Sequence, residues 1–342
     1  MTPTVSGRRR SSWWRLADVP ALLVALAVGA VTYGCTRTPL APAPPPGFYT
    51  WPAPLRSSPG TLLRYRSLGV PIAGARAFRI LYVSTTSGGL PRTTGGVLVV
   101  PDATPPAAGR PVVAWAHPVV GTDTAPSAST TPLASMEPWL SRGVHDGWVV
   151  VATDFVAVGT HRQETFVGRA ETDDLAYSVV AARQFPQAHA GTAWVVFGAS
   201  SGGHGALWSG SIAPALVPGL RLLGIAAVAP VAELVPIEHA EGKPWAPRLS
   251  AQTPSPPPAA MPVFIAQGTR DDIVPAATTE LLQHQWCTAG STLFVDWLGG
   301  VTHEGAVGAA SPSAVNWIQH RFLGSPAPRN CGVEPPVGRS SG

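Results

Sequence analysis

The central stretch of the chain reads Trp194-Val195-Val196-Phe197-Gly198-Ala199-Ser200-Ser201-Gly202-Gly203-His204. Its apolar half predicts a strand buried on both faces, and its small residues predict a helix. The middle of the stretch has the pattern G-x-S-x-G, whose glycines allow a sharp turn between strand and helix. This turn would expose the Ser200 hydroxyl at the positive end of the helix, so we predict Ser200 as a nucleophile. Ser201 is the competing hydroxyl, but it lies one step into the helix, where its N–H is better placed as an oxyanion donor.

Apolar runs recur on both sides of this stretch. The candidate strands are Ala77–Ser84, Gly96–Val100, Val112–His117, Trp148–Asp154, Trp194–Gly198, Leu222–Pro230, Pro262–Gly268 and Thr292–Trp297. The candidate helices are Thr172–Gln184, Gly202–Ser209, Thr278–Gln285 and Ser313–Phe322. The turn at Ser87-Gly88-Gly89 predicts that the first two strands form an antiparallel hairpin. The alternation of strands and helices after them predicts that the remaining strands of the sheet run parallel. We therefore expect one α/β domain over residues 55–332, with a mostly parallel eight-stranded sheet and helices on both faces.

A serine nucleophile needs a base, and the base needs an orienting acid, usually on loops after later strands. Asp271 follows the strand Pro262–Gly268 in a turn closed by a proline, and His303 lies in a glycine-flanked loop after the last strand. The order Ser200, Asp271, His303 is that of the α/β-hydrolases, and all three lie at carboxyl ends of strands. Asp272 is the rival acid.

The other histidines carry weaker signals. His204 and His320 fall within expected helices, where we interpret them as structural. The nine histidines show neither an H-E-x-x-H motif nor Cys/His spacing, so the sequence predicts no metal site. Catalysis by a Ser-His-Asp arrangement needs no cofactor.

Nine blocks of sequence, in order, resemble the secretory lipases, an α/β-hydrolase family that includes the A-type yeast lipases. They run from Phe48 to Cys331 and include Pro59–Arg64, Arg79–Thr85, Val113–His117, Ala125–Ser127, Ala152–Asp154, Val167–Arg169, Gly198–His204, Gly268–Pro275 and His303. The resemblance implies an α/β-hydrolase fold and an exported serine esterase or lipase acting on small-molecule or lipid esters. It also places Ser200, Asp271 and His303 at the matching triad positions.

Three departures from the family affect this interpretation. His117-Pro118-Val119 stands where bacterial members carry His-Gly-Thr; Pro118 has no N–H, so Val119 is the expected oxyanion donor beside Ser201. Thr124 replaces a family cysteine, so one family disulfide is expected to be missing. The family's helical lid is reduced to Val231–Met261, which has only 31 residues, seven of them prolines. We expect a loop flap there, hence a comparatively open site and a preference for short-to-medium acyl esters.

The net charge of +4 is concentrated at the N-terminus, in Arg8, Arg9, Arg10 and Arg15, so no basic surface for nucleic acid is predicted. The arginines precede an apolar run, Ala21–Gly34, too short for the ~20 residues of a membrane span. We interpret residues 1–35 as an export segment, with Cys35 a lipidation candidate that would anchor the protein to a membrane. The alternative is a conventionally cleaved signal, or an uncleaved one whose residues 11–34 would be kept as an anchor. A Pro-rich tether, 36–54, and a disordered tail, 333–342, would flank the domain; nothing identifies a protein partner.

Two further cysteines, Cys287 and Cys331, remain if Cys35 is processed. An even number in an oxidising compartment predicts a disulfide, and the alternative is two separate buried thiols. Closing this 44-residue interval would contribute about 3–4 kcal/mol in the chain-entropy model.

Two classes of function fit these observations. The first is an exported carboxylic ester hydrolase, with amidase or acyltransferase chemistry as variants on the same triad. The second is a non-catalytic envelope protein on the same scaffold, because a fold alone does not determine function. The donor around Pro118 discriminates them, since losing one oxyanion donor costs about 10²–10³ in rate.

Overall fold

The computed structural model describes residues 47–118, 133, 135–157, 162–237, 239 and 241–333. The expected export segment with Cys35, the tether up to residue 46, the positions of Thr124 and Val119, and the tail from residue 334 lie outside the described residues. Among the helices of the described part, none combines the length and the apolar character that crossing a bilayer requires.

Ten strands in the described part form one mixed sheet, in the order β1-β2-β3-β5-β4-β7-β8-β9-β10, with β6 paired to β5. The first three strands and β6 are antiparallel to their neighbours, and β5, β4 and β7 to β10 run parallel. The strands are β1 (Leu62–Ser67), β2 (Ala75–Thr85), β3 (Pro91–Pro101), β4 (Arg110–Ala116), β5 (Val149–Ala157), β6 (Arg162–Gln163), β7 (Ala190–Ala199), β8 (Arg221–Val228), β9 (Val263–Gly268) and β10 (Leu293–Leu298).

The expected α/β-hydrolase fold is confirmed, and all eight expected strands are present. The sheet exceeds the expected count of eight because β1 and β6 carry no continuous apolar run. β1 is an edge strand with its C-terminal half exposed, and β6 has two residues. In the parallel part, β4 and β9 are almost wholly buried and β7 is buried from Trp194 to Ala199, as the uninterrupted apolar runs predict.

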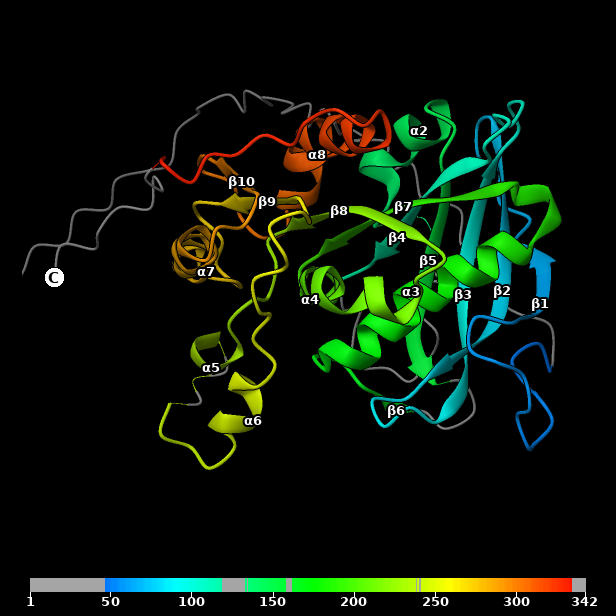
Figure 1. Ribbon diagram of the computed structural model, residues 1–342, viewed down its shortest axis with the longest axis horizontal. Helices are drawn as coiled ribbons and strands as arrows, with labels where there is room; N and C mark the ends of the chain where they lie inside the picture. The colour runs from blue at the N-terminus through cyan, green and yellow to red at the C-terminus, as the bar shows by residue number, and fades with distance from the viewer. Residues whose placement is uncertain are drawn as a thin grey trace, which may run out of the picture. The chain divides into compact units, whose positions relative to one another are not determined.

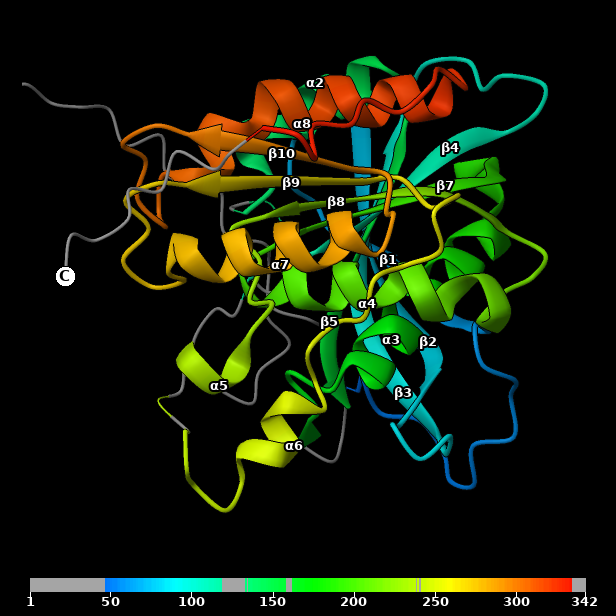
Figure 2. The same cartoon turned by 60° about the vertical axis from the view of Figure 1, so that its left-hand side comes forward.

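Helices cover both faces of the sheet (Figures 1 and 2). On one face lie α3 (Gly168–Gln184), α4 (Ser201–Leu216) and α7 (Ala276–Thr288), and on the other lie α2 (Glu137–His145) and α8 (Ala306–Phe322). Each face has its own apolar core, the first including Leu175, Leu207 and Trp286, the second including Trp139 and Trp317. A short 3-10 turn, Pro186–Ala188, follows α3. The sequence did not predict α2, which has only nine residues and contains Gly143, a poor helix former; Pro138 lies in its first turn, where proline is tolerated.

The first described residues pack on the edge of the sheet. Phe48 is 3% exposed, and the Arg64 guanidinium donates to the carbonyls of Gly47 and Phe48, both at 2.6 Å. The Arg64 group also lies 5.6 Å from the centre of the Trp51 ring. Residues 47–51, assigned to the tether from their sequence, therefore pack against the domain, because β1 supplies a cation for their carbonyls and rings.

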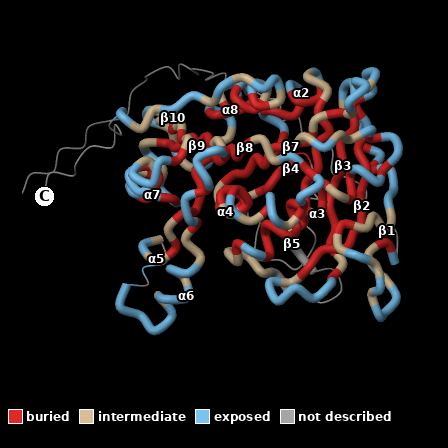
Figure 3. The backbone as a smooth tube through the Cα atoms, in the orientation of Figure 1, coloured by how far each residue is buried: buried red, intermediate tan, exposed pale blue. Residues whose placement is uncertain are grey.

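The interval Val231–Met261 forms a loop segment with two short helices, α5 (Leu234–Ile237) and α6 (Ala246–Ser250), and we call this interval the flap. Its outer turn, including Trp245, is exposed, and Figure 3 shows the segment that carries α5 and α6 as mostly exposed or intermediate, below the buried strands of the sheet. Prolines limit both helices to about one turn, so the described residues of the flap form no long cap helix.

A disulfide joins Cys287, at the end of α7, to Cys331 in the C-terminal segment, as the sequence predicts. The neighbouring Asn330 side chain exchanges two hydrogen bonds with the backbone of Val295 in β10, at 2.7 and 2.8 Å. The segment after α8 is thus attached to α7 by one covalent bond and to the edge strand β10 by an amide side chain.

Candidate active site

The turn between β7 and α4 holds Ser200 in an unusual backbone conformation, with φ 53° and ψ −121°. A positive φ is strained for a residue with a side chain, and it persists only where neighbours determine it. Here the Ser200 N–H donates to Val228 O at 2.9 Å, and the Ser200 carbonyl accepts from Val231 N–H at 3.1 Å. Hydrogen bonds to the end of β8 and to the flap therefore hold the turn in place.

The start of α4 lies against the chain that leaves β4. A Cβ atom at Gly202 would overlap the carbonyl oxygen of Ala116 and approach that of His117 to 2.6 Å, so only glycine fits. His117 donates from Nδ1 to the Pro118 carbonyl at 2.7 Å, and burial lowers the pKa of His117 below its ordinary value. The two segments expected to supply oxyanion donors are therefore adjacent. Ser201, the first residue of α4, is 6% exposed.

The histidine and the two other expected catalytic side chains meet at this edge of the sheet. His303 Nε2 lies 2.9 Å from Ser200 Oγ, and His303 Nδ1 lies 2.9 and 3.0 Å from the two carboxylate oxygens of Asp271. Because a carboxylate only accepts, Nδ1 carries the proton, which leaves Nε2 of the neutral ring to accept from the serine hydroxyl. The Asp271 side chain is fully buried, and that of His303 is 12% exposed.

Several donors surround the Asp271 carboxylate. Burial alone would raise the pKa of Asp271, but the hydrogen bond from His303 and the backbone N–H groups of Val274 and Ile273 outweigh it. The net effect holds this pKa below its ordinary value. Asp272, the rival acid, is exposed, and the structure brings Asp271 rather than Asp272 to His303.

The loops that carry the acid and the base are connected directly. Arg270 N–H donates to Val301 O at 3.1 Å, and Gly300 N–H donates to Thr269 Oγ1 at 2.9 Å. These loops follow β9 and β10, which pair in parallel register over their whole lengths. The two strands therefore determine the spacing between acid and base.

Sequence reasoning missed one contact of the acid. Gln267, buried in β9, donates from Nε2 to Asp271 Oδ2 at 3.0 Å, and its own Oε1 accepts from Thr279 at 2.8 Å. The available signal was a polar residue inside an otherwise apolar run. Of the weaker histidines, His204 is fully buried in α4, and His320 is exposed on α8. Within the described ranges, no three His, Cys, Asp or Glu side chains gather so as to hold a metal ion.

The sheet order, the strand–turn–helix at Ser200 and the two helical layers define an α/β-hydrolase. A family model described as secretory lipase matches residues 125–252 and 251–330. The chain therefore belongs to the secretory lipase family, whose members are lipase-like hydrolases.

Individual proteins are similar to this chain to different extents. Lipase 1 and Lipase 6 of Candida albicans are 35% and 38% identical over 74 residues, or 21% of this chain, and the matches span only 15% and 16% of those lipases. Candida antarctica lipase A shares the fold, with a TM-score of 0.69 and 16% identity over 85% of this chain and 89% of that one. The rice cell wall degrading esterase LipA of Xanthomonas oryzae has a TM-score of 0.57 at 16% identity, over 78% of this chain and 99% of that one.

Proposed function

We propose that this protein is an exported serine carboxylic ester hydrolase that works through an acyl-enzyme. The observation that carries the proposal is the unbroken hydrogen-bond path from Ser200 Oγ through His303 to Asp271, with separations of 2.9 Å. Family membership supports ester hydrolysis, and the disulfide fits a protein outside the cytoplasm. Lipidation at Cys35 stays part of the proposal, since that residue lies outside the described part of the chain.

In the proposed mechanism, His303 takes the Ser200 proton as the serine oxygen attacks the ester carbonyl. Asp271 stabilises the resulting imidazolium, and its lowered pKa keeps the carboxylate ionised for that role. The protonated His303 then donates to the leaving alkoxide, and a water activated by the same ring releases the acid.

The tetrahedral oxyanion needs N–H donors near the first turn of α4. We propose the N–H of Ser201, at the helix N-terminus, and that of Val119, which follows Pro118 and lies outside the described residues. The close approach of the Ala116–His117 backbone to Gly202 supports this arrangement.

Substrate preference follows from the flap. Its two short helices leave Trp245 half exposed, while Leu249 packs on apolar residues beside the site. Each buried CH₂ contributes about 0.8 kcal/mol, so an enzyme with limited acyl cover gains little from long chains. We propose that it prefers esters with short-to-medium acyl chains.

A series of p-nitrophenyl esters from acetate to palmitate tests both parts, with Ser200→Ala as the control. We expect turnover that depends on Ser200, highest kcat/KM for short and medium chains, and no jump in rate above the solubility limit. Dominant long-chain rates would contradict the preference alone. Absence of Ser200-dependent turnover would contradict the hydrolase proposal and favour the non-catalytic alternative.

A further inference from the structure

A buried polar contact joins three segments one helical turn from Ser200. His204 in α4 is fully buried; its Nδ1 lies 2.6 Å from Glu171 Oε2 in α3, and its Nε2 lies 2.7 Å from the backbone carbonyl of Gln252 in the flap. The two helices approach so closely that a Cβ at Gly205 would lie 3.0 Å from Glu171 Cβ. We call Glu171, His204 and Gln252 the clamp.

The Gln252 carbonyl oxygen can only accept hydrogen bonds, and this determines which groups of the clamp are donors to it. A carbonyl oxygen only accepts, so Nε2 of His204 carries a proton and donates it to Gln252 O. The indole N–H of Trp208, 3.0 Å from the same carbonyl, is therefore a second donor to it. The Gln252 side chain adds a third contact, because its Oε1 accepts from Gly168 N–H at 3.1 Å. One flap residue thus satisfies donors from both helices.

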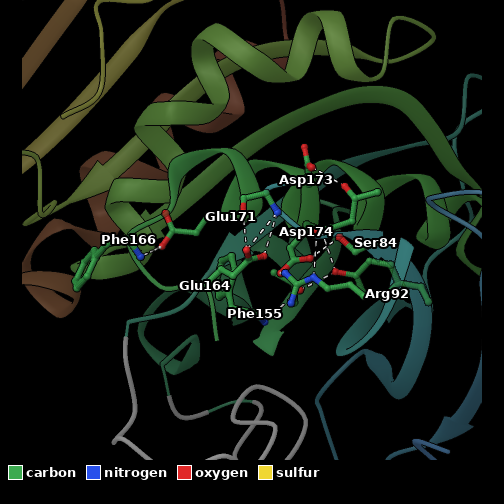
Figure 4. Close-up of polar contacts among 12 residues, drawn as sticks. Ser84, Arg92, Phe155, Glu164, Phe166, Glu171, Asp173 and Asp174 are labelled. Atoms are coloured by element: carbon green, nitrogen blue, oxygen red, sulfur yellow. Dashed lines mark hydrogen bonds and ion pairs between the residues drawn. The ribbon is translucent and has the colours of Figure 1, made fainter. Parts of the chain in front are cut away.

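The clamp also holds an aromatic residue. Glu171 Oε1 accepts from the Phe166 N–H at 2.8 Å, a contact visible in Figure 4. The Phe166 ring packs edge-on against the His204 ring, with centroids 5.6 Å apart. Phe166 has a φ of 57°, a conformation that bulky residues adopt only where surrounding contacts determine it. Glu171 and His204 supply those contacts.

These contacts end in an apolar cluster beside the nucleophile. Val231, Leu234 and Val274 are buried together, and Phe166, Ile237 and Leu249 pack against them. Val231 donates to the Ser200 carbonyl, and Val274 donates to the Asp271 carboxylate. The cluster therefore adjoins the serine turn, the acid loop and the flap.

We propose that Glu171 and His204 are positioning residues for the acyl chain of the substrate, an inference that rests on the function proposed above. Through Gln252 they hold the flap against α4, and through Phe166 they hold one side of the apolar cluster. The clamp thereby determines how much of a medium-length acyl chain is buried. It leaves the bond-breaking step to Ser200, His303 and Asp271.

A matched pair of variants at Glu171 tests the proposal. In Glu171→Gln, a neutral His204 with its proton on Nε2 accepts at Nδ1 from the amide nitrogen, and the amide oxygen still accepts from the Phe166 N–H, so both contacts of residue 171 are retained. Glu171→Leu, of similar size, removes both contacts. Gln252→Ala is the mild variant, since it loses only the bond to Gly168 and keeps the buried pair. Each is assayed with p-nitrophenyl acetate and p-nitrophenyl octanoate, and hydrogen exchange is measured over residues 241–253.

We expect Glu171→Leu to raise KM for the octanoate about tenfold, with kcat and the acetate reaction within about twofold of wild type. Exchange over 241–253 should be faster in Glu171→Leu, unchanged in Glu171→Gln and intermediate in Gln252→Ala. Equal losses on both esters, or a Glu171→Gln variant as impaired as Glu171→Leu, would overturn the proposal. If Glu171→Leu does not fold, Gln252→Ala decides: an unchanged octanoate KM with unchanged exchange overturns it. If the wild type hydrolyses neither ester, the hydrolase proposal fails, and with it the acyl role; the exchange data still test whether the clamp holds the flap.

Discussion

Two buried aspartates of this protein have opposite electrostatic surroundings. Asp271, after β9, is surrounded by donors from Gln267, His303 and two backbone N–H groups, and its pKa lies below the ordinary value. Asp174, in α3, accepts from Ser84 and from Arg92, and burial raises its pKa to about 6 (Figure 4). The carboxylate of its neighbour Asp173 opposes ionisation further.

The difference lies in the number and direction of the donors. Asp271 sits in a turn whose N–H groups point at its carboxylate, which favours the negative charge that faces the His303 imidazole. Asp174 has one guanidinium, from Arg92, and links α3 to β2 and β3 in the antiparallel part of the sheet. We therefore expect changes around Asp271 to alter turnover and changes around Asp174 to alter stability.

The largest expected effect comes from changing the proposed nucleophile or base. Ser200→Ala and His303→Ala should each lower kcat by about 10⁴–10⁶, because the triad acts as a unit, while the thermal unfolding midpoint stays within a few degrees. Hydrolysis of p-nitrophenyl butyrate and circular dichroism melts measure the two effects. Turnover of Ser200→Ala near the wild-type level would refute the assignment.

The next effect separates the two neighbouring acids. Asp271→Asn keeps the size of the side chain but removes the charge that stabilises the imidazolium, so kcat should fall about 10³–10⁴-fold. Asp272→Asn changes an exposed side chain and should leave kcat within about twofold. Steady-state kinetics on both variants decides between them, and the reverse ranking would make Asp272 the acid.

Arg92→Leu tests the role of the other aspartate, Asp174, because it removes the charged partner of that carboxylate. Removing one partner of a buried pair should lower the free energy of unfolding by about 3–5 kcal/mol, with kcat per folded molecule unchanged. Arg76→Leu is the matched control, since Arg76 and its partner Asp102 are both about half exposed and their pair should contribute at most about 1 kcal/mol. Denaturant unfolding of both variants tests this, and equal losses would contradict it.

The smallest effect is a pH dependence of stability. Because the folded-state pKa of Asp174 is raised from 3.8 to about 6, the folded protein binds this proton more tightly than the unfolded chain. The contribution of Asp174 should therefore lower the free energy of unfolding by roughly 2 kcal/mol as pH rises from 4 to 7. The contribution of Asp271 has the opposite sign and falls in a lower pH range. Because its folded-state pKa is lowered, Asp271 stabilises the fold at higher pH, and this stabilisation is lost as pH falls below about 3.8.

Unfolding measured between pH 4 and 7 on wild type and Asp174→Asn isolates the Asp174 contribution. Asparagine does not titrate, so the variant should lack the downward trend that wild type shows. Superimposable pH profiles would indicate that Asp174 ionises at its ordinary pKa.

Much of the fold is readable in the sequence because buried parallel strands need unbroken apolar runs. The runs before Ser200 and before Asp271 are of this kind, and both are strands at the expected positions. The edge strand β1 was not predicted because half of it faces solvent and its sequence mixes apolar and polar residues without a continuous apolar run. Helix α2 was not predicted because it is short and contains Gly143; its buried residues Trp139 and Leu140 supply tertiary contacts that outweigh this weak propensity.

The sequence by itself determined the strand–turn–helix at Ser200 and the chain order of serine, acid and histidine, because each depends on a local signal of a few residues. Only the tertiary structure decided that Asp271, rather than Asp272, faces His303, since two neighbours in one turn point to different sides. It also decided that Gln267 supports the acid and that Glu171, His204 and Gln252 meet. Those partners lie on separate strands, helices and loops, and such contacts form only when the whole sheet has brought the segments together.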